Sequence, residues 1–174
     1  MLEEDRHLGG FAQFVERFCF AQGNVNGLFL DVRHAESLID RLIFRYHPDY
    51  RGVPLIADGP ALRRPGFSYE GGDVQALGPS TLAIGVSERT SAKALDALGA
   101  ALAANLGGPI SIFAVELPVE RATIHLDMVF TMIDRDACLV HESKVLGKRR
   151  CRVARLDVDP SGRSSVREVP SLLE

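Results

Sequence analysis

The order of strand-like and helix-like runs after residue 73 constrains the fold more than any other feature of this sequence. Two short apolar runs, at 74–77 and 81–86, flank a Gly-Pro-Ser segment that is typical of a hairpin turn. A stripe of leucines at helical spacing then covers 90–106. β-branched and aromatic runs follow at 110–116, 124–133, 137–140 and 152–158. This order predicts a ββαβ unit followed by the start of another, which is an α/β architecture.

The N-terminal third predicts two helices and an irregular connection. Apolar residues recur at helical spacing in a predicted helix at 1–24 and again at 34–46. The face of the second helix that is expected to point inward consists of Leu38, Ile39, Leu42 and Ile43. His47-Pro48 ends this helix, because the residue before a proline is disfavoured in helical conformation. We expect a single domain over residues 1–174, with an α/β core at 67–160 and an irregular segment at 48–66.

Composition excludes several classes of function. Lys and Arg number 20 against 23 Asp and Glu, whereas a dedicated nucleic-acid binder needs a large basic excess. No apolar run approaches the roughly 20 residues that span a bilayer, and residues 1–7 lack the basic start of a signal peptide. Cys19, Cys138 and Cys151 are too scattered for a disulfide framework or a metal cluster. We therefore expect a cytoplasmic, metal-free domain that binds neither nucleic acid nor membranes.

Two segments concentrate polar side chains next to predicted strands. In the first, at 69–73, Glu70 and Asp73 flank two glycines, which permit close backbone approach. In the second, at 87–90, Arg89 lies between a strand and a helix start, where it could hold a carboxylate by two parallel hydrogen bonds. Each segment has a simpler interpretation. The first could be a tight turn with solvated acids, and the second could cap the helix.

A third polar segment lies at 124–130, within a predicted strand. Strand geometry would place His125 and Asp127 on one face and their apolar neighbours on the other. An imidazole and a carboxylate are costly to bury without partners, so this pair is a candidate for proton transfer. A hydrogen-bonded core histidine is the alternative interpretation.

The three segments together resemble the arginine deiminases, which are guanidino-group-modifying enzymes. The resemblance is carried by Tyr-Glu-Gly-Gly-Asp-Val at 69–74, Gly-Val-Ser-Glu-Arg-Thr-Ser at 85–91, Val-Glu-Leu-Pro at 115–118 and His-Leu-Asp-Met-Val-Phe-Thr at 125–131. It runs in register over residues 36–140 and more loosely to residue 173. Related amidinotransferases and dimethylarginine hydrolases share the acid-Gly-Gly-Asp turn. The Ser-Glu-Arg-Thr and His-Leu-Asp-x-Val-Phe-Thr motifs look specifically like arginine deiminase.

The resemblance implies a reaction and a fold. The family converts L-arginine and water to L-citrulline and ammonia without a metal or an organic cofactor. A cysteine thiolate attacks the guanidinium carbon, ammonia leaves, and water hydrolyses the thiouronium intermediate. The family fold is an α/β propeller of ββαβ modules, the pentein type, of which this chain would be an incomplete example.

The resemblance also implies roles for individual residues. Asp127 would grip the guanidinium, and His125 would carry protons to the leaving ammonia and from the attacking water. Glu70 would orient His125 and raise its basicity while contacting the guanidinium. The residues implied to bind the rest of the substrate are Arg89, on its α-carboxylate, together with Asp73 and Arg33. For Asp73 the alternative is that it mainly braces the turn.

The chain departs from the family pattern at the nucleophile. The family's reactive cysteine stands in a Cys-Met-x-x-Pro-Leu-like context, which does not occur in this sequence. Cys19 and Cys138 have the spacing of packing residues. Basic residues at 148–150 and 152 are expected to lower the pKa of Cys151, although a charged strand edge is the simpler account of them. We expect a truncated or incomplete deiminase that makes no citrulline by itself.

Two other interpretations of the sequence stay open. The chain could be a non-catalytic guanidino-ligand binding or scaffold protein that kept the pocket turns. It could also act on agmatine or a methylated arginine, although agmatine has no carboxylate for Arg89 to bind. An incomplete propeller exposes strand edges and apolar faces, which predicts a homo-oligomer.

Overall fold

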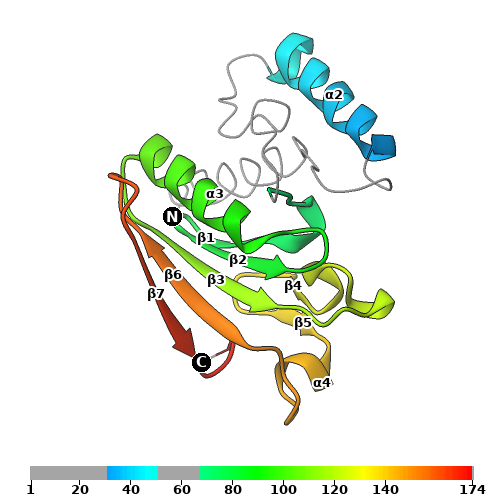
Figure 1. Ribbon diagram of the computed structural model, residues 1–174, viewed down its shortest axis with the longest axis vertical. Helices are drawn as coiled ribbons and strands as arrows, with labels where there is room; N and C mark the ends of the chain where they lie inside the picture. The colour runs from blue at the N-terminus through cyan, green and yellow to red at the C-terminus, as the bar shows by residue number, and fades with distance from the viewer. Residues whose placement is uncertain (1–30, 51–66, 174) are drawn as a thin grey trace.

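A five-stranded mixed sheet organises the chain, as seen in a computed structural model that describes residues 31–50 and 67–173 (Figure 1). Its strands, in spatial order, are β1 (Val74–Gly78), β2 (Thr81–Val86), β3 (Ile110–Glu116), β6 (Val153–Val158) and β7 (Ser164–Val169). β1 and β2 form the predicted antiparallel hairpin. β2 and β3 are parallel, so the chain must cross over between them, and helix α3 (Ala92–Leu106) makes that crossover. The predicted ββαβ unit and the α/β fold class are therefore confirmed.

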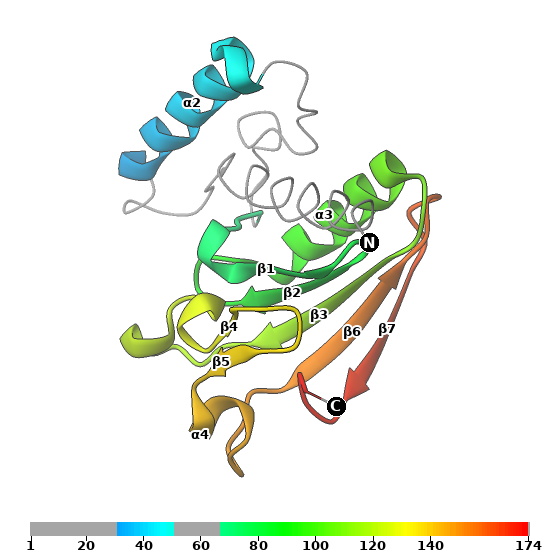
Figure 2. The same cartoon turned by 180° about the vertical axis from the view of Figure 1, so that it is seen from behind.

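The two faces of the sheet are covered by different elements. Figure 1 shows α3 on one face, and Figure 2 shows the two-stranded ribbon of β4 (Phe130–Met132) and β5 (Cys138–Val140) on the other. The short helix α4 (Glu142–Val145) follows the ribbon. Each face carries its own cluster of buried apolar side chains. Because strand side chains alternate between faces, one set of strands serves both clusters.

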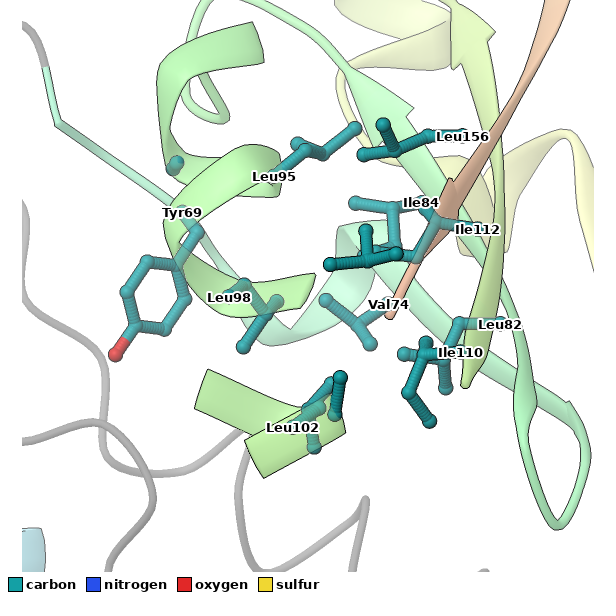
Figure 3. Packing of buried hydrophobic residues seen from close by; sticks show 13 residues of the cluster. Tyr69, Val74, Leu82, Ile84, Leu95, Leu98, Leu102, Ile110, Ile112 and Leu156 are labelled. Atoms are coloured by element: carbon teal, nitrogen blue, oxygen red, sulfur yellow. The ribbon is translucent and has the colours of Figure 1, made fainter. Parts of the chain in front are cut away.

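The cluster beneath α3 comes from the leucine stripe predicted for that helix. Figure 3 shows Leu95, Leu98 and Leu102 pointing at the sheet, where they meet Ile84 and Ile112. Removing each such side chain from water contributes about 1.5–3 kcal/mol to stability. The helix ends at Gly107, whose φ of +66° lies in the left-handed region that glycine adopts without strain. The fourth leucine of the stripe, Leu106, stays 43% exposed.

Helix α2 (Asp31–Tyr46) confirms the predicted helix, but not its predicted orientation. The helix stops at Tyr46, before His47-Pro48, and the short helix η1 (Pro48–Tyr50) follows. The residues expected to face inward, which are exposed by 40% to 56%, are Leu38, Ile39, Leu42 and Ile43. Phe44 is buried instead, with its ring 5.1 Å from that of Tyr50. An apolar stripe indicates a helix, but it does not say what covers the stripe.

The structure differs from the sequence prediction at 124–133 and after residue 160. The first segment is not one strand, because the short helices η3 (Arg121–Thr123) and η4 (Leu126–Met128) precede β4. Strand β7 is not among the predicted strands, because strand prediction relies on the alternating pattern of a half-buried strand. Residues 164–168 are all exposed and do not form a buried face. No helix within the described residues is both long and apolar enough to cross a membrane. The helix predicted at 1–24 and the segment 51–66 lie outside the described residues.

Candidate functional site

Three turns meet beside the ends of β1 and β2, and they carry the polar residues that the sequence singles out. The first contains Glu70 and the short helix η2 (Gly71–Asp73), directly before β1. The second is the segment 87–90, between β2 and α3. The third starts at His125 and continues into η4. Side-chain hydrogen bonds join all three turns, although they are separated by up to 55 positions in the chain.

Glu70 lies at the centre of this arrangement. Its side chain is only 2% exposed, and its Oε2 lies 2.5 Å from Nε2 of His125. The same oxygen accepts a hydrogen bond from Nη1 of Arg89, at 3.1 Å. Glu70 therefore binds two groups at once. One is the imidazole that is expected to carry protons, and the other is the guanidinium of the arginine that is expected to bind substrate. A buried carboxylate needs such partners, because leaving it unpaired would cost several kcal/mol.

The contact with Glu70 places a hydrogen on Nε2 of His125. An ionised carboxylate only accepts hydrogen bonds, so the ring nitrogen facing it, Nε2, is the donor. The second ring nitrogen, Nδ1, lies on the side of Gly72, as does Oδ2 of Asp127. The His125 side chain is 18% exposed and Asp127 is exposed. Both groups can therefore be reached from solvent.

Asp73 lies beneath these residues and is fully buried. Its Oδ2 accepts hydrogen bonds from the hydroxyls of Thr90 and Ser87, at 2.6 and 2.8 Å. Its Oδ1 accepts one from the backbone N–H of Leu126, at 2.9 Å. Burial raises the pKa of Asp73 from the ordinary value of 3.8, while these three hydrogen bonds and the charge of His125 act in the opposite direction.

Two glycines allow the turns to approach one another closely. A Cβ on Gly72 would lie 2.6 Å from Nδ1 of His125 and 3.0 Å from Oδ2 of Asp127. A Cβ on Gly85 would lie 2.5 Å from Oδ1 of Asp73. A side chain at either position would therefore displace a site residue.

The prediction that His125 and Asp127 lie on one face of a strand is wrong in its geometry. His125 has extended backbone, but Leu126–Met128 forms a single 3-10 turn. Burial of Leu126 and Val129, together with the bond from Leu126 N–H to Asp73, accounts for this turn. His125 and Asp127 nevertheless approach the same glycine, Gly72, because the turn brings them back to one side.

The remaining candidates fall elsewhere. Arg33 belongs to α2, but its side chain lies outside the described residues. Cys138 and Cys151 are free thiols that pack against the second buried cluster. Burial raises the pKa of Cys151, and the charge of Lys144 offsets this only in part, so the expected lowering is wrong. Cys19 lies outside the described residues.

The second segment does not act as a simple helix cap. Ser91 is at the N-cap of α3 without a capping hydrogen bond from its side chain. Its hydroxyl accepts a hydrogen bond from the backbone N–H of Ser68 instead. The hydroxyls of Ser87 and Thr90, which the alternative interpretation of this segment would use as caps, donate hydrogen bonds to Asp73. In the sequence, the one signal for this contact was the spacing of the two hydroxyls from an acidic Gly-Gly-Asp turn. Only the fold brings the two segments together.

Within the described residues no group of three or more His, Cys, Asp or Glu side chains is placed to hold a metal ion. The site instead combines a buried carboxylate, an imidazole, an exposed carboxylate and an arginine, namely Glu70, His125, Asp127 and Arg89. The carboxylates can bind a planar cationic group of a ligand, and the imidazole can exchange a proton with it. The arginine can bind an anionic group of the same ligand.

Comparison with known proteins agrees with this chemistry. Residues 24–171 match the family described as "Arginine deiminase". The chain is 38% identical over 122 residues to arginine deiminases of Staphylococcus aureus strains MRSA252, JH9 and Newman, covering 68% of this chain and 29% of each relative. The chain thus spans less than a third of the length of these relatives. The match takes in every turn of the site, and the chain belongs to the arginine deiminase family.

Proposed function

We propose that this chain carries the guanidinium-binding and proton-transfer part of an arginine deiminase site, with L-arginine as the substrate. The observation that supports this most directly is Glu70, whose buried carboxylate already binds a guanidinium, that of Arg89, together with the imidazole of His125. A carboxylate in this setting has the charge and the geometry for a guanidino substrate. Family membership supports the same substrate class.

The proposed roles follow from the positions of the groups. His125, held by its Nε2 on Glu70, has Nδ1 left to give a proton to the departing ammonia and to take one from the attacking water. Asp127 holds the guanidinium from the exposed side. Arg89, one-third exposed, leaves Glu70 when substrate arrives and binds the α-carboxylate. Glu70 then keeps its contact with His125 while exchanging the guanidinium of Arg89 for that of the substrate.

We further propose that β1, β2, α3 and β3 form one module of an α/β propeller of the pentein type. The parallel neighbours β2 and β3 with their helical crossover support this, since they form the ββαβ unit that such a module requires. Among the described strands β7 has a neighbour on one side only, and an edge strand of this kind supports self-association into a homo-oligomer. A cytoplasmic location, with no nucleic-acid or membrane partner, completes the proposal and is consistent with a net charge of −3.

The nucleophile is the part of this proposal that the described residues do not supply. The reaction needs a thiolate that attacks the guanidinium carbon, but Cys138 and Cys151 are both partly buried and pack against the second buried cluster. Burial also raises the pKa of Cys151, which disfavours the thiolate. We therefore expect the chain alone to bind arginine without converting it. This observation also favours a second candidate, a guanidino-ligand binding protein without turnover.

Calorimetry and a citrulline assay test the proposal. The chain should bind L-arginine more tightly than agmatine, which lacks the carboxylate that Arg89 would hold. Arg89→Ala and Asp127→Ala should each abolish arginine binding, while Arg163→Ala, on the exposed turn before β7, should leave it unchanged. A flat titration with the unmodified chain would refute the proposal. Citrulline formation that disappears in Cys151→Ser would refute the expectation that the nucleophile is absent.

A further inference from the structure

The directions of the hydrogen bonds around Asp73 define what this position requires. The hydroxyl of Ser87 accepts hydrogen bonds from the backbone N–H groups of Arg89 and Thr90, both at 3.1 Å. The hydroxyl of Thr90 accepts one from the backbone N–H of Glu70, at 3.0 Å. Because an N–H group can only donate, each hydroxyl has its single hydrogen left for Asp73.

The group at position 73 therefore faces three hydrogen-bond donors. Two hydroxyls and the N–H of Leu126 all point at it. An ionised carboxylate, which only accepts, satisfies all three. An asparagine would turn its NH2 group toward at least one donor, and a buried donor without an acceptor is costly. The burial of Asp73 and the occupation of both its oxygens also leave no edge of this carboxylate for a substrate.

The three donors lead to the three turns of the site. Through Thr90, Asp73 is connected to the backbone of Glu70, and through Ser87 to the backbone of Arg89. Through Leu126 it is connected to the residue that follows His125. We propose that Asp73 is a positioning residue, which acts through the Ser87 and Thr90 hydroxyls and the Leu126 N–H. These contacts hold Glu70, Arg89 and His125 in fixed positions relative to one another. This inference rests on the proposed function for its consequence in substrate binding.

A second aspartate provides a matched control. Asp157 accepts a hydrogen bond from the hydroxyl of Ser111 at 2.6 Å and one from Nε of Arg155 at 2.8 Å. The Ser111 hydroxyl also accepts one from Arg155, at 3.0 Å. The same kind of serine-aspartate pair thus occurs on β3 and β6, and its hydrogen bonds to Ser111 and Arg155 lie within these two strands, away from the three turns of the site. Replacing Asp157 therefore shows what the loss of a serine-aspartate hydrogen bond does when it occurs away from the site.

The direct readout is the hydrogen bond between His125 and Glu70. In histidine-labelled protein the Nε2–H of His125 should give a downfield, slowly exchanging proton signal, assigned by its absence in His125→Gln. Asp73→Asn and Thr90→Val should abolish this signal in protein that remains folded by circular dichroism. Thr90→Ser, which keeps the hydroxyl, should restore it, and Asp157→Asn should leave it unchanged. Arginine affinity should fall about tenfold or more in Asp73→Asn.

The possible results separate the two proposals. An unchanged signal in folded Asp73→Asn and Thr90→Val, or no signal in the unmodified chain, would overturn the positioning role. If Asp73→Asn does not fold, Thr90→Val and Ser87→Ala decide, since each removes a single hydroxyl. If the unmodified chain binds no arginine but the signal follows the expected pattern, the positioning role stands and the proposed function fails. If the unmodified chain binds arginine and all variants bind it with equal affinity, the proposed function stands, but the positioning role of Asp73 in substrate binding is refuted.

Discussion

Replacing Gly72 by alanine tests most directly whether close contact between the turns holds His125 in place. The added Cβ would lie 2.6 Å from Nδ1 of His125, whereas ordinary contact begins at 3.4 Å, so the ring has to move by about 0.8 Å. Its Nε2 is already in contact with Glu70, at 2.5 Å, so this shift breaks or bends that hydrogen bond. Overpacking of this kind costs about 1–3 kcal/mol of stability.

Thermal unfolding and arginine titration measure the two consequences. The melting temperature of Gly72→Ala should fall by roughly 2–4 °C for each kcal/mol lost. Loss of the His125–Glu70 hydrogen bond should also weaken arginine binding, by about tenfold for each 1.4 kcal/mol of interaction lost. The control is Gly78→Ala, since a Cβ there meets nothing within 4 Å. If Gly72→Ala matches the unmodified chain in melting temperature and in the His125 proton signal, the contact does not constrain the ring, and the reasoning is refuted.

Three further predictions concern packing and ionisation. Leu102→Ala should lower the free energy of unfolding, measured by chemical denaturation, by about 2–5 kcal/mol, because Leu102 is 1% exposed. The same change at Leu106, which is 43% exposed, should lower it far less. Equal losses would contradict the described packing of α3. Burial alone would raise the pKa of Asp157, but hydrogen bonds from Ser111 and Arg155 outweigh it and lower the pKa below 3.8. The stability from this carboxylate is therefore present above pH 3.8 and lost as the pH falls further, and Asp157→Asn should remove that part of an acid-unfolding curve. Cys151 should react with iodoacetamide at pH 8 more slowly than a free cysteine, because burial raises its pKa; a faster reaction would contradict this.

Local patterns in the sequence were sufficient where one segment determines its own structure. The leucine stripe predicted α3, and the Gly-Pro-Ser turn predicted the β1–β2 hairpin, because periodicity and turn chemistry depend on neighbouring residues. They were insufficient where a distant contact overrides them. The segment 124–133 has the composition of a strand, yet the bond from Leu126 N–H to Asp73 accompanies a turn there instead.

The sequence by itself determined the ββαβ order and which residue types could form a site for a guanidino group. The family resemblance already paired Glu70 with His125, but only the tertiary structure decided that Arg89 shares the same carboxylate and that Asp73 is buried behind them. The physical reason is that hydrogen bonds form between atoms about 3 Å apart in space, whatever their separation in the chain. Residues 55 positions apart meet here because the sheet brings their turns to one end and glycine leaves room between them.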